Sequence, residues 1–294
     1  MPKWMALPIL CSDPLSSVAY ATDEIILVLA LGGVGWVTHT PLVAGAVIAL
    51  IVIIVMSYRQ TCYAYPSGGG AYAVSRANLG DGAALIAASA LMIDYIMTVA
   101  VSISSGVANI ASAFPTVATH AVPITLACIV LLAVMNLRGV RESGTLFAIP
   151  TYGFIVSILI LVGWGFVKWV LGQPITAPTA NLHYRDVQTM TGLTGAILLL
   201  RAFASGCTAL TGVEAISNAV PHFRSPKSRN ASTTLLIMLL LSVTMFGGTA
   251  LLSAKAGIKL THDNSSLNLP AGTVQQTVLA QLGSAISGNG TLLF

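Results

Sequence analysis

The chain has 294 residues, of which 55% are hydrophobic and only 7% are charged, and its mean hydropathy is +0.86. Soluble domains carry a charge on roughly a quarter of their residues. So few charges cannot cover the surface of a soluble protein, and the composition indicates an integral membrane protein. The formal net charge of +4 reflects membrane topology and gives no reason to propose a nucleic acid partner.

Several apolar segments have about the length of 20 residues that crosses a bilayer as a helix. The sequence therefore predicts an all-α integral membrane protein with about seven transmembrane helices. The first segment contains acidic residues and lacks a small-residue cleavage site, so we do not interpret it as a signal peptide. The expected spans are 5–32, 41–58, 83–113, 122–137, 146–171, 191–220 and 232–253.

The basic residues between these spans predict the orientation of the protein. With the amino terminus in the cytoplasm, the inside segments hold Lys3, Arg59, Arg76, Arg138, Arg141, Arg224, Lys227 and Arg229. The outside segments then hold only Lys168, Arg185, Lys255 and Lys259, and Arg201 lies within a span. Because basic residues concentrate on the cytoplasmic side, we expect a multi-pass protein of the cytoplasmic membrane with its amino terminus inside.

The first span is interrupted by polar residues in the stretch ILCSDPLSSVAYATDEI, residues 9–25. A residue before proline is pushed toward extended dihedrals, so we expect a helix break at Ser12 and Pro14, with Asp13 capping a new helix. Capping alone would explain this pair in a soluble protein. Within lipid, a break and a carboxylate are tolerated only beside protein or water. We therefore predict an ion or substrate site at Asp13, with Tyr20 facing the same cavity.

The loop after the second span reads YPSGGGAY, residues 65–72. Three consecutive glycines can suggest a phosphate-binding loop, but the lysine and the following Ser or Thr of that motif are absent. We expect instead a tight cytoplasmic turn between the second and third spans, packed near the inner gate.

The third span carries a polar stripe along one helical face, and Tyr95 lies beside its first member. Single Ser and Thr residues in such helices usually bond their own backbone. Five aligned polar groups that begin with an aspartate are more specific, and they indicate the lining of a hydrated path. The members of the stripe are Asp94, Thr98, Ser102, Ser105 and Asn109.

The sixth span has a weak helical centre in LLLRAFASGCTALTGVEAISNAV, residues 198–220. We predict a helix break at Gly206 and Gly212, with Thr211 and Glu214 at the site. A packing interface of small residues is the alternative, and it explains the glycines but not the glutamate. Interrupted helices at matching places in two halves point to an inverted-repeat transporter with its site near the midplane.

The cysteines and histidines show no ligand spacing, so we do not expect a zinc site or any organic cofactor. The four cysteines are scattered through apolar segments, where they suit packing. The five histidines are expected in loops.

Four motifs resemble the amino acid–polyamine–organocation (APC) superfamily: SDPLSSVAYATDE (12–24), YPSGGGAY (65–72), NLRGVRESG (136–144) and TGVEAISNAVPHFRSPKSRN (211–230). The first motif resembles the KUP-type potassium importers, especially the bacterial KimA-like branch. The resemblance implies a secondary transporter rather than an enzyme, with a LeuT-like inverted-repeat (5+5) fold and discontinuous helices 1 and 6. It implies proton-coupled potassium uptake by alternating access.

The resemblance also implies a set of site residues. The bound potassium ion would be held by Asp13, Asp94 and Glu214 with Thr98, Ser102 and Thr211, and Tyr20 and Tyr95 would line its path. Potassium and protons are the transported species, the lipid bilayer is the surrounding partner, and a homodimer of the full-length protein is compatible with the resemblance.

The chain departs from the family pattern in length, because such proteins have about twelve spans. We assign 1–190 to the first inverted repeat and 191–294 to the start of a second, incomplete repeat. We accordingly expect a fragment or a truncated gene product that does not transport by itself.

Two other functions remain open at this point. An amino acid permease of the same superfamily would hold a substrate carboxylate on free N–H groups of a glycine-rich break. Pro14 removes one such group and Asp13 would repel the carboxylate, which favours potassium. A receptor or scaffold of seven helices is disfavoured by the buried acids and by the paired breaks.

Overall fold

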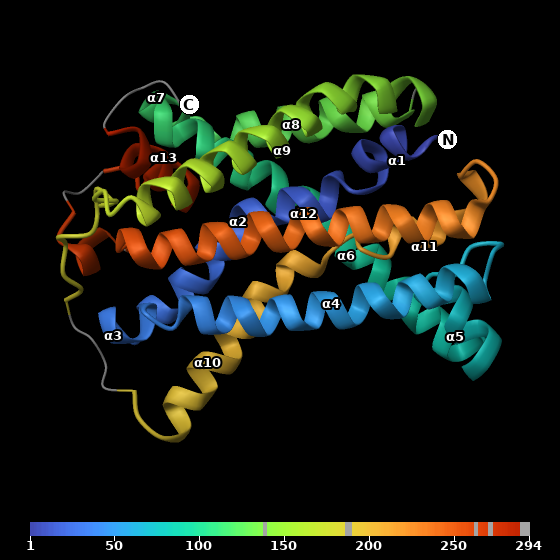
Figure 1. Cartoon of the computed structure of the whole chain (residues 1–294), viewed down its shortest axis with the longest axis horizontal. Helices are drawn as coiled ribbons and strands as arrows, with labels where there is room; N and C mark the ends of the chain where they lie inside the picture. The colour runs from blue at the N-terminus through green and yellow to red at the C-terminus, as the bar shows by residue number, and fades with distance from the viewer. Residues whose placement is uncertain (138–139, 186–189, 262–263, 270–272, 289–294) are drawn as a thin grey trace.

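The computed structural model describes residues 1–137, 140–185, 190–261, 264–269 and 273–288, which form helices and no β-strand (Figure 1). The all-α architecture predicted from the composition is confirmed. The α-helices are α1 (Lys3–Leu10), α2 (Ser12–Ala30), α3 (Val34–Val37), α4 (Thr40–Ala64), α5 (Ala71–Leu79), α6 (Asp81–Ala113), α7 (Pro115–Ala118), α8 (Ala121–Leu137), α9 (Val140–Val170), α10 (Leu193–Gly206), α11 (Ala215–Asn218), α12 (Lys227–Ala256) and α13 (Val278–Ser287). Three short 3₁₀ helices are η1 (Cys207–Leu210), η2 (Val220–His222) and η3 (Asn264–Leu267).

Each of the seven expected spans is helical apart from the interruptions in the first and sixth, and five regions of the described part of the chain are long and apolar enough to cross a membrane. The first expected span is not among the five, because it divides into α1 and α2 and because α2 carries three acidic residues. The fourth, α8, has only 17 residues, fewer than the ~20 of a typical span. The five regions are Val34–Ala64, Asp81–Ala113, Ala148–Val170, Leu193–Asn218 and Lys227–Ala256.

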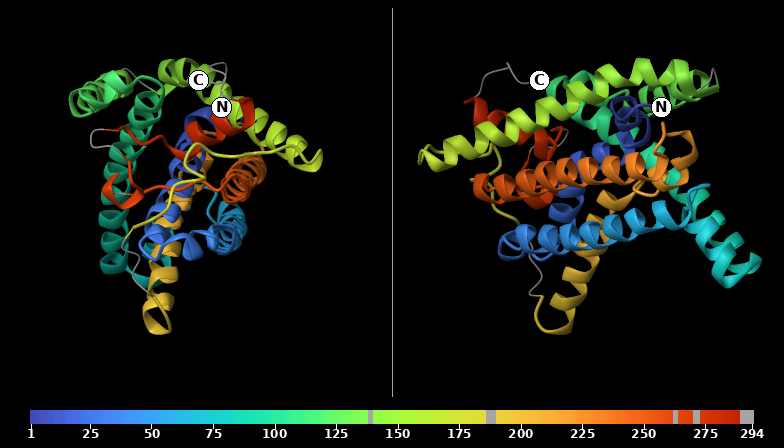
Figure 2. Two further views of the ribbon diagram at one scale, coloured as in Figure 1. Left: turned by 90° about the vertical axis from the view of Figure 1, so that its left-hand side faces the viewer. Right: turned by 45° about the vertical axis from the view of Figure 1, so that its right-hand side comes forward.

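The buried core lies where α2 packs against α4, α10 and α12. Helices α4 and α12 run side by side through the centre of the bundle, whereas α8 and α9 lie on one side and α10 reaches the other (Figures 1 and 2). Leu15 and Ile25 of α2, Val47 of α4 and Phe246 of α12 are all fully buried. Close packing of this kind holds membrane helices together, since lipid is as apolar as the side chains.

The predicted tight turn after α4 is confirmed, and it packs against α11. The N–H of Gly69 donates to the carbonyl oxygen of Ser217 at 3.1 Å. A Cβ on Gly70 would lie 1.8 Å from Oδ1 of Asn218, so with the Asn218 side chain in this position the close approach is made by glycine. The start of the chain lies at the same end of the bundle, because the N–H of Arg224 donates to the carbonyl oxygen of Met1.

The opposite end of the bundle is held together by bonds between two connecting segments. The N–H of Ala177 donates to the carbonyl oxygen of Ala256 at 2.9 Å. The ammonium of Lys259 is buried and donates to the carbonyl oxygens of Ala180 at 2.8 Å and Leu182 at 2.5 Å. These bonds join the segment after α9 to the segment after α12.

Helix α13 lies at this second end and bonds to both α2 and α6. Thr277 caps α13 by accepting from the N–H of Ala280, and its hydroxyl donates to Oδ1 of Asn109 at 2.7 Å. The N–H of Val278 lies 3.3 Å from both carboxylate oxygens of Asp23. Asn109, which the polar stripe placed on a hydrated path, is therefore engaged with α13 in this structure.

Candidate functional site

The sixth span unwinds between α10 and α11. The α-helix ends at Gly206 and continues as the 3₁₀ helix η1, after which Thr211 turns extended with ψ 143°. Gly212 has φ +75°, in the left-handed region that favours glycine, and α11 begins at Ala215. The chain therefore leaves the regular i→i+4 ladder here and is held by turn bonds, from the N–H of Thr211 to Thr208 and from the N–H of Ala215 to Gly212.

The first span is interrupted at Cys11, so the expected break at Ser12 and Pro14 was wrong by one to three residues. Asp13 is not an extended cap but the second residue of α2, and Pro14 is the third. Proline is compatible with this place because the N–H groups of a first helical turn have no partner within their own helix. The chain therefore kinks at one residue instead of unwinding.

The two interruptions meet at Asp13. A Cβ on Gly212 would lie 2.4 Å from Oδ2 of Asp13 and 2.8 Å from Cδ of Pro14, so the carboxylate rests directly on the unwound backbone. The other oxygen, Oδ1 of Asp13, is buried and has no hydrogen-bond partner among the described residues. A buried carboxylate oxygen without a donor is costly and marks a place where a cation would be stabilised.

A chain of hydroxyl groups connects three spans beside this carboxylate. The Ser17 hydroxyl lies 2.9 Å from that of Thr211 and 2.8 Å from that of Tyr20. The Tyr20 hydroxyl lies in turn 3.3 Å from that of Ser102 on α6. The structure thus brings together α2, α6 and the unwound segment through neutral oxygen groups.

A cavity of about 530 Å³, the Asp13 pocket, opens between α2, α6 and α9. None of the described residues that line it is basic. Hydroxyls and one carboxylate therefore supply its polar surface, which suits a cation better than an anion. Its polar lining residues are Ser12, Asp13, Ser16, Tyr95, Thr98, Ser102 and Thr151.

A second cavity of about 250 Å³, the Glu214 pocket, is lined by the unwound segment together with α4 and α6. Asp94, Thr211 and Glu214 line it together with Tyr58. Glu214 is only 8% exposed, and its Oε1 accepts from the Tyr95 hydroxyl at 2.7 Å. Its Oε2 accepts from the Tyr58 hydroxyl at 3.3 Å.

The three expected acids are therefore divided between two pockets. Asp94 and Glu214 share the smaller pocket, and Asp13 belongs to the larger one, although Asp94 is close enough for its charge to act on Asp13. Over the described part of the chain, no three His, Cys, Asp or Glu side chains are grouped to hold a metal ion. Tyr95 separates the pockets, since it lines the first and bonds Glu214 in the second.

Two residues of this region were missed from the sequence. Ser17 belongs to the quoted motif, and its spacing of three residues before Tyr20 could have indicated a shared helical face. Tyr58 follows a long apolar run and precedes Arg59, a position typical of an aromatic residue at the membrane interface. Only the fold places it against Glu214.

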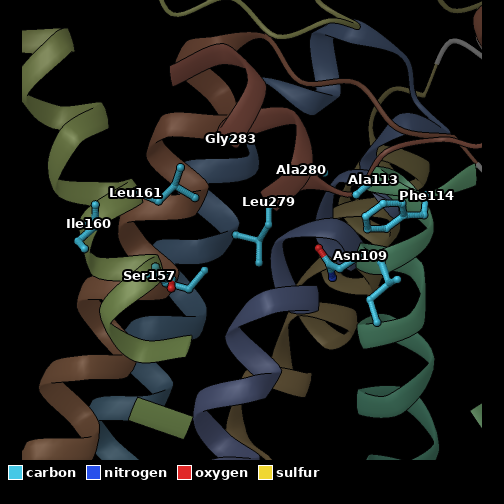
Figure 3. A pocket seen from close by; sticks show the side chains of 11 residues that line it. Asn109, Ala113, Phe114, Ser157, Ile160, Leu161, Leu279, Ala280 and Gly283 are labelled. Carbon is cyan, nitrogen blue, oxygen red and sulfur yellow. The ribbon is translucent and has the colours of Figure 1, made fainter. Parts of the chain in front are cut away.

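A third cavity, of about 540 Å³, lies between α6, α9 and α13 (Figure 3). Its polar lining side chains already have partners: Asn109 bonds Thr277 and Ser105, and the Ser157 hydroxyl donates to the carbonyl oxygen of Gly153. The remaining lining is apolar, including Leu161 and Leu279. This cavity therefore provides fewer available oxygen ligands for a cation than the Asp13 pocket does.

Comparison with known proteins agrees with the motifs. A family model described as amino acid permease matches residues 4–292. The potassium transporter KimA of Bacillus subtilis (strain 168) is 41% identical over 292 residues, which cover 99% of this chain and 46% of the relative. This chain thus spans a little under half the length of that relative. The resemblance drawn from the motifs is confirmed, and the chain belongs to the amino acid permease family of the APC superfamily.

Proposed function

We propose that this chain forms the cation site of a proton-coupled potassium transporter of the cell membrane, which works by alternating access. The observation that carries the proposal is the buried Oδ1 of Asp13, which has no partner among the described residues and lies in a pocket lined by hydroxyls. Potassium is bound in proteins by oxygen groups that replace its hydration shell. Asp13, Thr98 and Ser102 supply such groups from two helices.

An amino acid substrate fits this pocket less well. A substrate carboxylate would need free N–H donors or a basic side chain at the break. Here Oδ2 of Asp13 rests against Gly212, and the described lining residues of the pocket include no basic group. The name of the relative, a potassium transporter, agrees with the same choice.

The test is ion binding by the purified protein in lipid nanodiscs. Radioactive rubidium, a potassium analogue, should bind and be displaced by potassium but not by leucine or glutamate. Asp13→Asn should weaken rubidium binding at least about tenfold, equivalent to ~1.4 kcal/mol. Asp81→Asn is the matched control, because Asp81 is exposed and pairs with Arg76. Saturable leucine binding without rubidium binding would overturn the assignment.

We propose Glu214 as the proton-exchanging group, with Asp94 beside it. A buried carboxylate without a basic partner can be neutralised either by a proton or by a cation, so the two can exchange. Glu214→Gln keeps the size of the side chain and removes its titration. Rubidium binding by this variant should lose its pH dependence. A pH dependence equal to that of the unmodified protein would move the proton site elsewhere.

We propose that 1–190 correspond to the first inverted repeat and 191–294 to the beginning of a second. The first helical region of each part is interrupted, at Cys11 and at 211–214, and the two interruptions pack against each other at Asp13 and Gly212. Paired interruptions of this kind are the sequence and structural mark of inverted-repeat transporters.

The proposed orientation places the amino terminus in the cytoplasm. In support, the turn before α5 and the segment after α11 lie at one end with Met1, and the segment after α9 lies at the other end. Cysteines placed at Lys227 and Ala180 separate the two orientations by labelling with a membrane-impermeant reagent. Labelling from outside should modify position 180 and spare position 227. The reverse pattern would invert the topology.

A further inference from the structure

Glu214 is held by two hydroxyl groups from two different helices. Tyr95 of α6 donates to Oε1 at 2.7 Å, and Tyr58 of α4 donates to Oε2 at 3.3 Å. The two donors occupy both carboxylate oxygens, so the side chain is fixed on both sides. Tyr95 lines the Asp13 pocket, whereas Tyr58 lines the Glu214 pocket and is not among the described residues that line the Asp13 pocket.

The surroundings of Glu214 give it no charged partner of opposite sign. The titratable side chains that face it are Tyr58 of α4, Asp94 and Tyr95 of α6, and Cys207 of η1. None of these is basic. Its carboxylate is therefore stabilised by hydroxyl donors alone, and a hydrogen bond to a charged group is stronger than one between neutral groups.

Tyr58 is placed on a part of α4 that is itself fixed. The neighbouring Arg59 donates through Nε to the Ser232 hydroxyl of α12 at 3.0 Å. Helices α4 and α12 pack along their length in the centre of the bundle (Figure 1). The Tyr58 hydroxyl is therefore carried by a well-packed helix, whereas Glu214 follows an unwound segment in which Thr211 and Gly212 are held by i→i+3 turn bonds rather than by helical i→i+4 bonds.

We propose that Tyr58 is a positioning residue that holds the Glu214 carboxylate in its own pocket, apart from Asp13, until a proton or a cation replaces that hydrogen bond. The inference rests on the proposed function of Glu214 in proton exchange. The bond from Tyr58 is the longer of the two, so it is the first to be lost when Glu214 moves toward Asp13. Tyr95, at the wall between the pockets, can keep its bond through that movement.

The contact is tested by a double-mutant cycle on the thermal unfolding of the purified protein. The cycle combines Tyr58→Phe, which removes only the hydroxyl, with Glu214→Met, which removes both acceptors at similar length. Tyr58→Phe should lower the unfolding midpoint of the otherwise unmodified protein and leave that of the Glu214→Met protein unchanged. Equal shifts in both backgrounds would overturn the contact.

The role in ion binding is tested by the pH profile of rubidium binding. Tyr58→Phe should change the rubidium affinity about threefold to tenfold, the range of one hydrogen bond. It should also change the pH profile of binding, because Glu214 loses one of its two hydroxyl donors. Tyr63→Phe is the matched control, five residues along α4 and 58% exposed, and should change neither.

The outcomes separate this inference from the proposed function. Rubidium binding with an unchanged profile in Tyr58→Phe would overturn the positioning role and leave the ion site standing. Absence of rubidium binding by the unmodified protein would overturn the proposed function, and with it the role of Tyr58, while the unfolding cycle would still decide the contact.

Discussion

The two interrupted helices differ in how they leave helical geometry. Between α1 and α2 the bonds continue on both sides of one residue: the N–H of Cys11 donates to Leu7 at 2.8 Å, and that of Leu15 donates to Cys11 at 3.0 Å. In the sixth span the chain leaves helical geometry at Thr211 and Gly212, the second of which has a positive φ, and returns to it at Glu214. The first interruption thus contributes a side chain, Asp13, to the candidate site, and the second contributes backbone.

The difference teaches how a site for a small ion can be assembled in a bilayer. A kink interrupts the hydrogen-bond ladder only locally, since the bonds resume at the N–H of Leu15, and it changes the direction of the helix enough to aim a carboxylate. An unwound segment is tolerated only where other groups meet its free N–H and carbonyl groups. Here each interruption lies against the other, and each is covered by its partner.

The sharpest test of this difference is Gly212→Ala. The left-handed backbone costs a non-glycine residue ~1–2 kcal/mol, and the new Cβ would lie 2.4 Å from Oδ2 of Asp13. We expect the free energy of unfolding to fall by about 2 kcal/mol or more and rubidium binding to weaken at least about tenfold. Gly163→Ala in α9 is the control, because a Cβ there meets nothing within 4 Å. Equal effects of the two substitutions would contradict the role of Gly212.

The next largest effect is expected at the turn that covers α11. A Cβ on Gly70 would lie 1.8 Å from Oδ1 of Asn218, the end of a side chain that can rotate away. Gly70→Ala should therefore lower the free energy of unfolding by about 1 kcal/mol, less than Gly212→Ala. Adding Asn218→Ala should recover part of this loss in the same unfolding measurement. No recovery would mean that Gly70 is needed for another reason.

Pro14→Ala addresses the first interruption and should have a smaller effect. Proline in the first turn of α2 removes no hydrogen bond within that helix, so replacing it restores none. The loss is limited to part of the buried ring, about 1 kcal/mol or less in the free energy of unfolding. Chemical unfolding measures it. A loss as large as that of Gly212→Ala would show that proline itself makes the kink.

The smallest effect is expected at Ser105→Ala. Asn109 bonds the carbonyl oxygen of Ser105, which the substitution keeps. The free energy of unfolding should stay within about 0.5 kcal/mol, and rubidium affinity should not change, whereas Ser102→Ala should weaken binding because Ser102 lines the Asp13 pocket. Equal losses of rubidium affinity in Ser105→Ala and Ser102→Ala would mean that the ion path extends beyond that pocket.

Much of the fold was predictable because apolar length is a strong signal in a membrane protein. The third span, expected at 83–113, is α6 (Asp81–Ala113), and the seventh, expected at 232–253, lies within α12 (Lys227–Ala256). The kink was misplaced because the rule for a residue before proline ignores the first helical turn, where proline is accepted. Asp13 is helical despite that rule, and its carboxylate packs against Gly212.

The candidate site was only partly predictable, because its key contacts join distant parts of the chain. Spacing alone placed Asp13, Tyr20 and the stripe of α6 on plausible faces. The pairing of Ser17 with Thr211 crosses 194 positions, and that of Tyr58 with Glu214 crosses 156. No local pattern encodes either one. The division of the acids between two pockets has the same origin, since Asp13, Asp94 and Glu214 lie on three different spans.

Helix α13 has a mechanical consequence for the end of the bundle where it lies. The amides of Thr277 and Val278 donate to the Ser112 hydroxyl of α6 and to the Asp23 carboxylate of α2. These two neighbouring amides therefore link the two helices. Separating α2 from α6 at this end must break at least one of the two hydrogen bonds. The hydrogen-exchange rates of these two amides would consequently report how often that end of the bundle opens, whether or not an ion is transported.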